Sequence, residues 1–460
     1  MGSLAGLLKA RGIHVTGSDE RIYPPMSTAL EELAIPVFEG FSADHLTQLP
    51  AGRPDWVVIG NAIRADNPEA RAAIDGGYVY KSFPDALFEL ALAFKHPVVV
   101  SGTHGKTTTT SLVAFLLRAG HRDPSLLVGG ISLDFNGSFC EGSGDYFVVE
   151  GDEYDTAFFD KTPKFLHYHP KTLVLTSIEF DHADIYRDLA HVRQAFSKLV
   201  SEMPPDATIV ACWDDRNVRE VVSGAACRVI SYSTGDAEGA CWHAREIRAH
   251  SDGTEFRVEA PQGRASVRLP LHGEFNVANA LGALATVVEL GVSLGEAAAS
   301  LEGFRGIKRR QELRAEVAGV SIFDDFAHHP TAVRGSIAAL RSRYPGRRIV
   351  AVFEARTNTS RRRVFQEAYG DALAGADLVV LPRVDEAPIY SATGEVTEFL
   401  AVDDLVSDLR SRGVDARAED DVEGIVQSLA LACRPGDVIL VMSNGSFGNI
   451  WERLEDALSV

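Results

Sequence analysis

The feature that most limits how this chain can fold is a glycine-rich segment between a strand and a helix. Residues 101–110 (SGTHGKTTTT) follow the apolar run PVVVS and precede SLVAFLLRAG, which has the character of a helix. A glycine-rich turn in this position exposes backbone N–H groups at the positive end of the helix, where they can bind phosphates. Lys106 can reach the terminal phosphates of a nucleotide and the Thr107 hydroxyl can ligate Mg²⁺, although a glycine-rich turn that binds no nucleotide is the alternative. The predicted ATP-binding residues of this segment are Gly102, Thr103, His104, Gly105, Lys106, Thr107 and Thr108.

Short β-branched runs alternate with amphipathic stretches, which predicts an α/β protein with parallel sheets and flanking helices. The first helix is expected at residues 2–11, ended by Gly12 in a left-handed conformation. Residues 240–271 are expected to form an antiparallel patch instead. The expected strands are Ile13–Thr16, Trp56–Ile59, Tyr78–Tyr80, Val98–Ser101, Tyr146–Glu150, Leu173–Thr176, Arg348–Phe353, Asp377–Leu381 and Val438–Met442. With 460 residues, the chain is long enough for about three domains, which we predict at residues 1–95, 96–309 and 310–460.

Acidic residues and a histidine follow the ends of two strands of the second domain. The run YFVVE ends at Glu150, and a carboxylate at the end of a parallel strand beside a phosphate loop can bind Mg²⁺. The segment from Glu179 to His182 follows the run TLVLTS, so His182 is a candidate metal ligand or proton shuttle. The alternatives are a solvated acidic loop and a histidine with a structural role.

These motifs, with three more towards the C-terminus, resemble those of the Mur ligase family. The further motifs are Gly273–Asn279 (GEFNVAN), Phe304–Glu312 (FRGIKRRQE) and Asp324–Pro330 (DDFAHHP). The resemblance covers nearly the whole chain in the same order. It implies a Rossmann-like N-terminal domain, a central P-loop ATPase domain with a mixed sheet, and a Rossmann-like C-terminal domain. It also implies an ATP-dependent ligase that adds an amino acid or a peptide to a UDP-linked muramic acid precursor of peptidoglycan.

The resemblance also implies roles for individual residues. Asn276 and Asn279 stand one helical turn apart and are expected to contact adenine, with helix capping as the alternative. Arg310 is expected near the phosphates of ATP, and Asp325 near its ribose. The residues expected to be catalytic are Lys106, Glu150 and His182, and those expected to bind Mg²⁺ are Thr107, Glu150 and His182.

Within the family, three segments resemble the members that add a tripeptide more than those that add L-alanine. They are Glu153–Lys161 (EYDTAFFDK), Phe353–Thr359 (FEARTNT) and Met442–Ile450 (MSNGSFGNI). The implied reaction joins UDP-N-acetylmuramate to L-alanyl-γ-D-glutamyl-meso-diaminopimelate in the recycling of peptidoglycan. A UDP-N-acetylmuramate–L-alanine ligase is the first alternative. A nucleotide-binding protein that does not ligate, and an ATPase acting on protein partners, are alternatives of other classes.

The two remaining substrates have candidate contacts in the outer domains. Arg356 is the candidate that binds a carboxylate of the peptide bidentately, with Asn358 and Thr359 beside it. Family members begin with a strand and a glycine-rich turn before this first helix, whereas the chain begins within the helix. The missing N–H groups are expected to weaken binding of the UDP diphosphate. The candidates for the UDP-sugar, chosen because strand ends of a doubly wound fold often bind ribose, are Ser18, Asp19 and Asn61.

Charge and cysteine content exclude several other functions. The formal net charge of −19 argues against a nucleic-acid partner and against binding to anionic membranes. The five cysteines are scattered without paired spacing, which is typical of a reducing compartment. No apolar run approaches the length of about 20 residues that a membrane span needs. We therefore expect a cytoplasmic enzyme, and the sequence implies no obligate protein partner.

Overall fold

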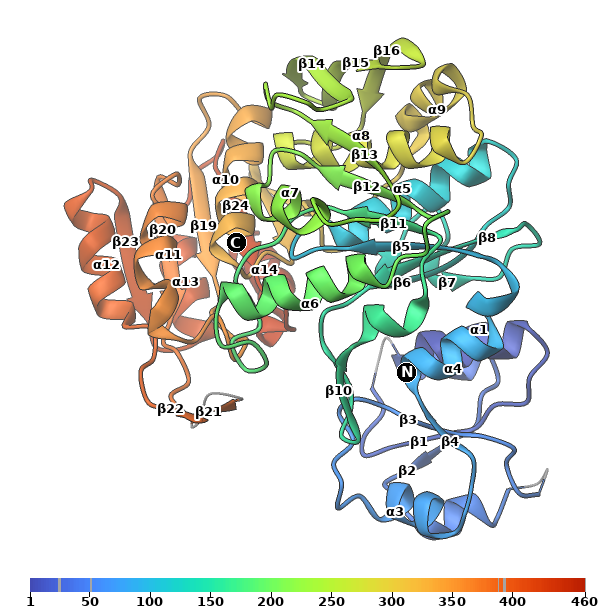
Figure 1. Cartoon of the computed structure of the whole chain (residues 1–460). Coiled ribbons are helices and arrows are strands. Elements are labelled where there is room, and N and C mark those ends of the chain that lie inside the picture. The colour runs from blue at the N-terminus through green and yellow to red at the C-terminus, as the bar shows by residue number, and fades with distance from the viewer. Residues whose placement is uncertain (24–25, 50–51, 388, 392–393, 460) are drawn as a thin grey trace.

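The computed structural model describes residues 1–23, 26–49, 52–387, 389–391 and 394–459 of the chain. Three groups of helices and strands follow one another in the order of the sequence, from the blue N-terminal group through the central group to the orange and red C-terminal group (Figure 1). Within the described ranges, every helix is too short or too polar to cross a lipid bilayer.

The N-terminal group contains two small parallel sheets, in which β1 pairs with β2 and β3 pairs with β4. Gly12 ends the first helix with a φ of +82°, as predicted. The predicted strand at Ile13–Thr16 is wrong, because the ladder begins only at Gly17. The side chains of Ile13 and Val15 pack against a hydrophobic cluster that includes the central sheet, so their β-branched character reflects packing. The elements are α1 (Gly2–Ala10), β1 (Gly17–Asp19), α2 (Met26–Glu32), β2 (Val37–Glu39), β3 (Val57–Ile59), α3 (Pro68–Asp75), β4 (Tyr80–Ser82) and α4 (Phe83–Leu90).

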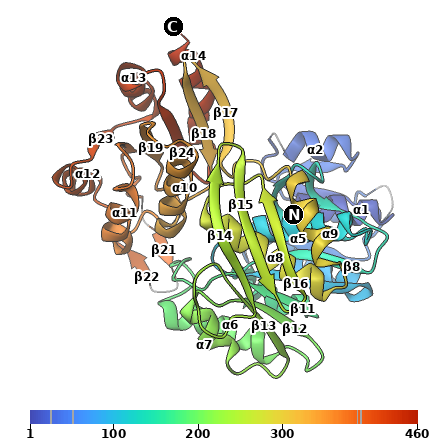
Figure 2. The same ribbon diagram turned by 90° about the horizontal axis from the view of Figure 1, so that it is seen from above.

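The central group is built on a ten-stranded mixed sheet in the order β16-β15-β14-β13-β12-β11-β5-β8-β6-β7. The seven strands β14, β13, β12, β11, β5, β8 and β6 run parallel to one another, and β7 is antiparallel to β6. The predicted antiparallel patch is confirmed as β14, β15 and β16, which lie side by side (Figure 2). The strands are β5 (His96–Ser101), β6 (Ser125–Ser132), β7 (Gly137–Cys140), β8 (Tyr146–Gly151), β11 (Thr172–Leu175), β12 (Thr208–Cys212), β13 (Arg228–Ser233), β14 (Trp242–His250), β15 (Gly253–Ala260) and β16 (Gly263–Leu269), with a hairpin of β9 (Asp155–Ala157) and β10 (Asp160–Pro163) beside them.

Helices cover both faces of the central sheet, because the side chains of a strand alternate between the faces. On β5, Val98 and Val100 join one hydrophobic cluster with residues of α5 and α8, whereas Val99 joins another with residues of α6 and α7. Leu7 of α1 and Leu87 of α4 belong to the second cluster, so these N-terminal helices pack against the central group. The central helices are α5 (Lys106–Ala119), α6 (Leu189–Ser201), α7 (Arg216–Val222), α8 (Glu274–Glu289) and α9 (Leu294–Ser300).

The C-terminal group has a six-stranded sheet in the order β17-β18-β24-β19-β20-β23. Only β17 is antiparallel to its neighbour. Residues of α10, α11 and α12 cover one face, and residues of α13 and α14 cover the other, which is a doubly wound arrangement. The elements are β17 (Glu312–Val317), β18 (Val320–Asp325), α10 (Pro330–Arg343), β19 (Ile349–Phe353), α11 (Gln366–Leu373), β20 (Leu378–Pro382), β21 (Ile389–Ser391), β22 (Gly394–Val396), α12 (Val402–Ser411), β23 (Asp415–Glu419), α13 (Val422–Ala432), β24 (Val438–Met442) and α14 (Ile450–Leu458).

Candidate active site

The phosphate loop, residues 101–110, turns from β5 into α5 beside a second helix. Gly105 precedes α5 with a φ of +80°, a conformation that costs glycine little. A Cβ atom at this position would lie 2.3 Å from Oδ1 of Asn279, so the close approach of α8 also requires glycine. No side chain caps α5. The N–H groups of its first turn therefore remain suited to an anionic ligand.

Hydrogen bonds hold the phosphate loop against the segment that follows β11. The backbone N–H of Thr103 donates to the carbonyl of Ser177 at 2.8 Å, and that of His104 donates to Oγ of Ser177 at 2.9 Å. The N–H of Glu179 in turn donates to Oγ1 of Thr103 at 2.8 Å. The loop and the acidic segment predicted as a metal site are thus neighbours.

Thr107 and Glu150 meet at the ends of α5 and β8. The Thr107 hydroxyl donates to Oε1 of Glu150 at 3.0 Å, and the N–H of Gly129 donates to Oε2 at 2.7 Å. Burial raises the pKa of Glu150 above its usual value and Asp152 adds repulsion, whereas Lys106 attracts the ionised form. The Thr107 hydroxyl and the Glu150 carboxylate thus place oxygen atoms side by side, and Mg²⁺ prefers oxygen ligands.

Glu153 is a buried carboxylate that is not among the predicted site residues. Its Oε2 accepts a hydrogen bond from Nζ of Lys106 at 2.8 Å, and its Oε1 lies 3.2 Å from Nε2 of His182. Burial opposes the ionised form, but Lys106 and His182 lower the pKa of Glu153 to about 2. In the sequence, Glu153 stands in an acidic run after a strand, which is equally typical of a solvated loop, and it begins the segment Glu153–Lys161 that resembles tripeptide-adding members. Glu153 joins two predicted catalytic residues through one carboxylate.

His182 lies among acidic groups and an aromatic ring. Burial opposes its protonation, yet Asp181 and Glu153 raise its pKa to about 9. The ring of Tyr154 lies 4.3 Å from the His182 ring, centroid to centroid. His182 is therefore an imidazolium at pH 7 in this arrangement, and binding a metal ion requires that it release a proton.

The two asparagines predicted to contact adenine lie buried on one face of α8. The side-chain N–H of Asn279 donates to Oδ1 of Asn276 at 3.2 Å, and the Asn276 amide donates to the carbonyl of His272 at 2.8 Å. Oδ1 of Asn279 accepts from the hydroxyl of Thr109 at 3.2 Å. Both residues thus stand beside the phosphate loop, and their contact with adenine stays a prediction.

Arg310 lies at the phosphate loop, whereas the carboxylate of Asp325 accepts hydrogen bonds from the backbone. Nη2 of Arg310 is 3.4 Å from Oγ1 of Thr107. The carboxylate of Asp325 accepts N–H bonds from Gln311 at 3.1 Å and from Ala327 at 2.8 Å. Burial raises the pKa of Asp325, against the attraction of Arg310. In this arrangement Asp325 organises the segments around it, and its predicted contact with ribose remains untested.

The peptide candidates of the C-terminal group differ in their surroundings. Arg356 and Asn358 are exposed, whereas Thr359 is buried. Oγ1 of Thr359 accepts the N–H of Ala183 at 2.9 Å, which places it next to the His182 segment. Arg356 runs so close to Gly445 that a Cβ atom there would lie 1.9 Å from Nη1 of the guanidinium.

The candidates for the UDP-sugar fall on two different small sheets. Oγ of Ser18 donates to Oε1 of Glu69 at 2.9 Å. Asp19 is exposed at the end of β1, and Asn61 is exposed just after β3. Their role in binding stays a prediction.

Comparisons with known proteins agree along the whole chain. Residues 1–95 match the description "Mur ligase family, catalytic domain", residues 100–287 match "Mur ligase middle domain", and residues 309–445 match "Mur ligase, glutamate ligase domain". The chain is 37% identical over 461 residues to the UDP-N-acetylmuramate–L-alanyl-γ-D-glutamyl-meso-2,6-diaminoheptandioate ligase of Escherichia coli K12, covering 100% of this chain and 96% of that protein. The chain belongs to the Mur ligase family.

Other members of the Mur ligase family are similar at lower identity. The UDP-N-acetylmuramate–L-alanine ligase of Acetivibrio thermocellus is 33% identical, with 98% of this chain and 92% of that protein covered. Among solved structures, a murein peptide ligase of Psychrobacter arcticus is 34% identical with a TM-score of 0.73, covering 100% of this chain and 96% of its own. The UDP-N-acetylmuramate–alanine ligase of Thermotoga maritima shares the three-domain fold. It is 24% identical with a TM-score of 0.77, covering 99% of this chain and 96% of that chain.

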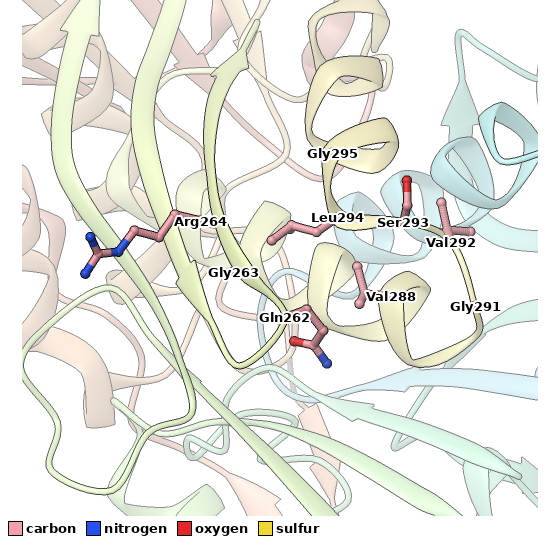
Figure 3. A pocket seen from close by; sticks show the side chains of 9 residues that line it. All are labelled: Gln262, Gly263, Arg264, Val288, Gly291, Val292, Ser293, Leu294 and Gly295. Atoms are coloured by element: carbon pink, nitrogen blue, oxygen red, sulfur yellow. The ribbon is translucent and has the colours of Figure 1, made fainter.

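A hollow of about 560 Å³ on this Mur ligase lies between the β15–β16 turn and the segment from α8 to α9 (Figure 3). Its lining is mostly glycine and aliphatic side chains, such as Val288, Val292 and Leu294. The one charged residue, Arg264, extends away from these side chains (Figure 3). The hollow offers no group suited to acid–base chemistry, so it is separate from the candidate active site.

Proposed function

We propose that this Mur ligase joins the carboxylate of UDP-N-acetylmuramate to the amine of L-alanyl-γ-D-glutamyl-meso-diaminopimelate, using ATP. The observation that carries the proposal is the hydrogen bond from Ala183 to Thr359. It brings the tripeptide motif of the C-terminal group against the segment of His182. The overall similarity supports the same reaction, because the relatives that are named for it match at 35–37% identity.

The chemistry requires that a carboxylate be activated before an amine can attack it. The muramoyl carboxylate attacks the γ-phosphate of ATP and displaces ADP, which gives an acyl phosphate. The amine then attacks the acyl carbon, and inorganic phosphate and a proton leave as the amide bond forms. Such phosphoryl transfer depends on positioning and on neutralising charge rather than on a protein nucleophile. Lys106 and Arg310, which both lie at the phosphate loop, are the cations that would neutralise the nucleotide oxygens.

Lys106 has to change partners to do this. In the structure its ammonium binds the carbonyl of Gly102 at 2.8 Å and the carboxylate of Glu153. A phosphate would compete with Glu153 for the same cation. Glu153 would then remain as an acceptor for His182, holding that imidazole in place.

Mg²⁺ would be held by Thr107 and Glu150, with His182 at a second ion, and it would supply charge neutralisation and alignment of the reacting oxygens. Asn276 and Asn279 would bind the adenine beside the phosphate loop. Asp325 is our candidate near the ribose, once its carboxylate exchanges a backbone partner for the sugar.

The acceptor peptide carries several carboxylates, and an exposed arginine can bind one of them bidentately. Arg356 has this role in our proposal, with Asn358 and Thr359 beside it. The UDP-sugar would bind in the N-terminal domain. Its proposed contacts are Ser18, Asp19 and Asn61, within domains that we propose to span residues 1–95, 96–309 and 310–460. We infer a cytoplasmic location, which the five free cysteines support.

A UDP-N-acetylmuramate–L-alanine ligase is the second candidate, because relatives of that name are 30–35% identical over 97–100% of the chain. Phosphate release with Mg-ATP and UDP-N-acetylmuramate distinguishes the two. Release with the tripeptide but not with L-alanine, together with a product of the summed mass, supports the proposal. Release with L-alanine alone supports the second candidate. ATP hydrolysis without either acceptor would contradict both.

A further inference from the structure

We propose that His104, Glu179 and His329 form a binding site for one Zn²⁺ ion, or a divalent ion of similar preference, between the central and C-terminal domains. One ligand atom from each of the three lies within 4.8 Å of the others. The donor set is two imidazole nitrogens and a carboxylate oxygen, which suits zinc and neighbouring transition metals. Mg²⁺ prefers oxygen ligands alone, so the site differs from the one proposed for the ATP-bound ion.

Two of the distances are close to those between neighbouring ligands of a tetrahedral ion. Nε2 of His104 is 3.3 Å, and Nδ1 of His329 is 3.5 Å, from the same Oε2 of Glu179. Two ligands of a tetrahedral Zn²⁺, each about 2.0–2.1 Å from the metal, are about 3.3–3.4 Å apart. Hydrogen bonds between a cation and a carboxylate are usually about 2.7–2.9 Å long. The remaining edge, between the two histidines, is within the 4.8 Å that spans all three ligand atoms.

The hydrogen bonds of His329 show which of its ring nitrogens can bind an ion. Its Nε2 donates to the carbonyl of Phe180 at 3.2 Å, and its Nδ1 accepts the N–H of Thr331 at 3.3 Å. Nδ1 is thus unprotonated, and its one lone pair is free to bind an ion once the long hydrogen bond from Thr331 is released. A metal ion bound there would replace that hydrogen bond by a bond to the same nitrogen.

The surroundings also resemble those of bound metals in general. A histidine ligand usually donates its second N–H to a carbonyl, and a carboxylate ligand usually accepts a further hydrogen bond. The Phe180 carbonyl serves His329 in this way, and the Thr331 hydroxyl donates to Oε2 of Glu179 at 2.7 Å. A hollow of about 300 Å³ opens beside Glu179 and His329. It gives an ion access and leaves room for water at the fourth position.

The site would connect the phosphate loop to the C-terminal domain. His104 belongs to that loop, whereas His329 is the N-cap of α10, and their rings are 4.6 Å apart between centroids. An ion bound by both holds the two domains in the arrangement of this structure. Zn²⁺ is therefore expected to raise the temperature of unfolding of the full chain.

The test is titration of the metal-stripped full chain with Zn²⁺ against a chromophoric chelator, in excess Mg²⁺. The expected result is one tightly bound Zn²⁺ per chain. His329→Gln should weaken it at least about 100-fold, since even the loss of a group that supports a ligand costs about 10- to 100-fold. The matched control is His250→Gln, because His250 also lies 3.3 Å from a carboxylate, that of Glu255, but on the surface. The control should bind Zn²⁺ as the unaltered chain does.

Co²⁺ provides a second measurement that needs no variant. Bound to the unaltered chain, it should give the visible absorption of a four-coordinate ion without the near-ultraviolet band of a thiolate ligand. A thiolate band, no tight Zn²⁺ in the unaltered chain, or unchanged affinity in folded His329→Gln and Glu179→Gln variants would each overturn the proposal. Circular dichroism of the variants establishes that they are folded.

Discussion

Replacing Glu153 with glutamine would test the buried ion pair at the centre of the candidate active site. Glu153 and Lys106 are 2% and 9% exposed, and the carboxylate also contacts His182. Glutamine keeps the shape of the side chain but removes its charge. The Lys106 ammonium would then be buried with less compensation, so we expect the central domain to lose stability.

The magnitude follows from two independent figures. The fall of the Glu153 pKa from its ordinary 4.5 to about 2 corresponds to about 3 kcal/mol of preference for the ionised form. Breaking one side of a buried ion pair typically costs about 3–5 kcal/mol. The amide oxygen still accepts a hydrogen bond, and Lys106 keeps its bond to the carbonyl of Gly102. We therefore expect a loss of about 2–3 kcal/mol, or about 4–12 °C in the unfolding temperature of a domain of this size.

Differential scanning calorimetry of the full chain without nucleotide or metal would measure this loss. Glu89→Gln is the control, because Glu89 pairs with Lys81 at 2.6 Å on the surface, where a pair is worth about 1 kcal/mol or less. The folded pKa of Glu153 lies below its usual value. The ionised carboxylate therefore stabilises the fold above about pH 4.5, and this stabilisation is lost as the pH falls towards 2. The difference in unfolding temperature between the unaltered chain and Glu153→Gln should shrink over the same pH range. An unfolding temperature of Glu153→Gln no lower than that of the control at pH 7 would refute the reasoning.

Three further variants test the proposed reaction. Glu150→Gln should reduce Mg²⁺-dependent phosphate release by about 100-fold or more. The unfolding temperature should stay the same, because burial already disfavours the charge of Glu150. Phosphate release at the unaltered rate would exclude Glu150 as a metal ligand. Gly445→Ala should displace Arg356 and raise the KM for the tripeptide about 10-fold, and an equal rise in the KM for ATP would contradict that role of Arg356. Thr359→Val leaves the buried N–H of Ala183 without its acceptor, a cost of about 1–3 kcal/mol. It should lower kcat/KM about 5- to 100-fold, with Thr359→Ser as the control that keeps the hydroxyl and the activity.

The sequence determined the parts of this protein that depend on neighbours along the chain. The glycine-rich turn between an apolar strand and a helix predicted the phosphate loop, and Gly105 has the left-handed backbone that such a turn requires. Strand β24 begins and ends at the predicted residues, because a run of five buried aliphatic residues has few other solutions. The same reasoning failed at Ile13–Thr16, since a β-branched run that packs against a distant sheet has the same composition as a strand.

Only the tertiary structure decided which side chains share a site. Glu153 reads as one acid among several in the sequence, and it became a partner of Lys106 and His182 because the segment after β8 turns back towards α5. The carboxylate of Asp325 binds the N–H of Ala327, a close neighbour in the chain, but also that of Gln311 from a more distant segment. His104 and His329 are separated by more than two hundred residues and meet across a domain boundary. Spacing along the chain carries no information about such meetings, because they depend on how whole domains pack.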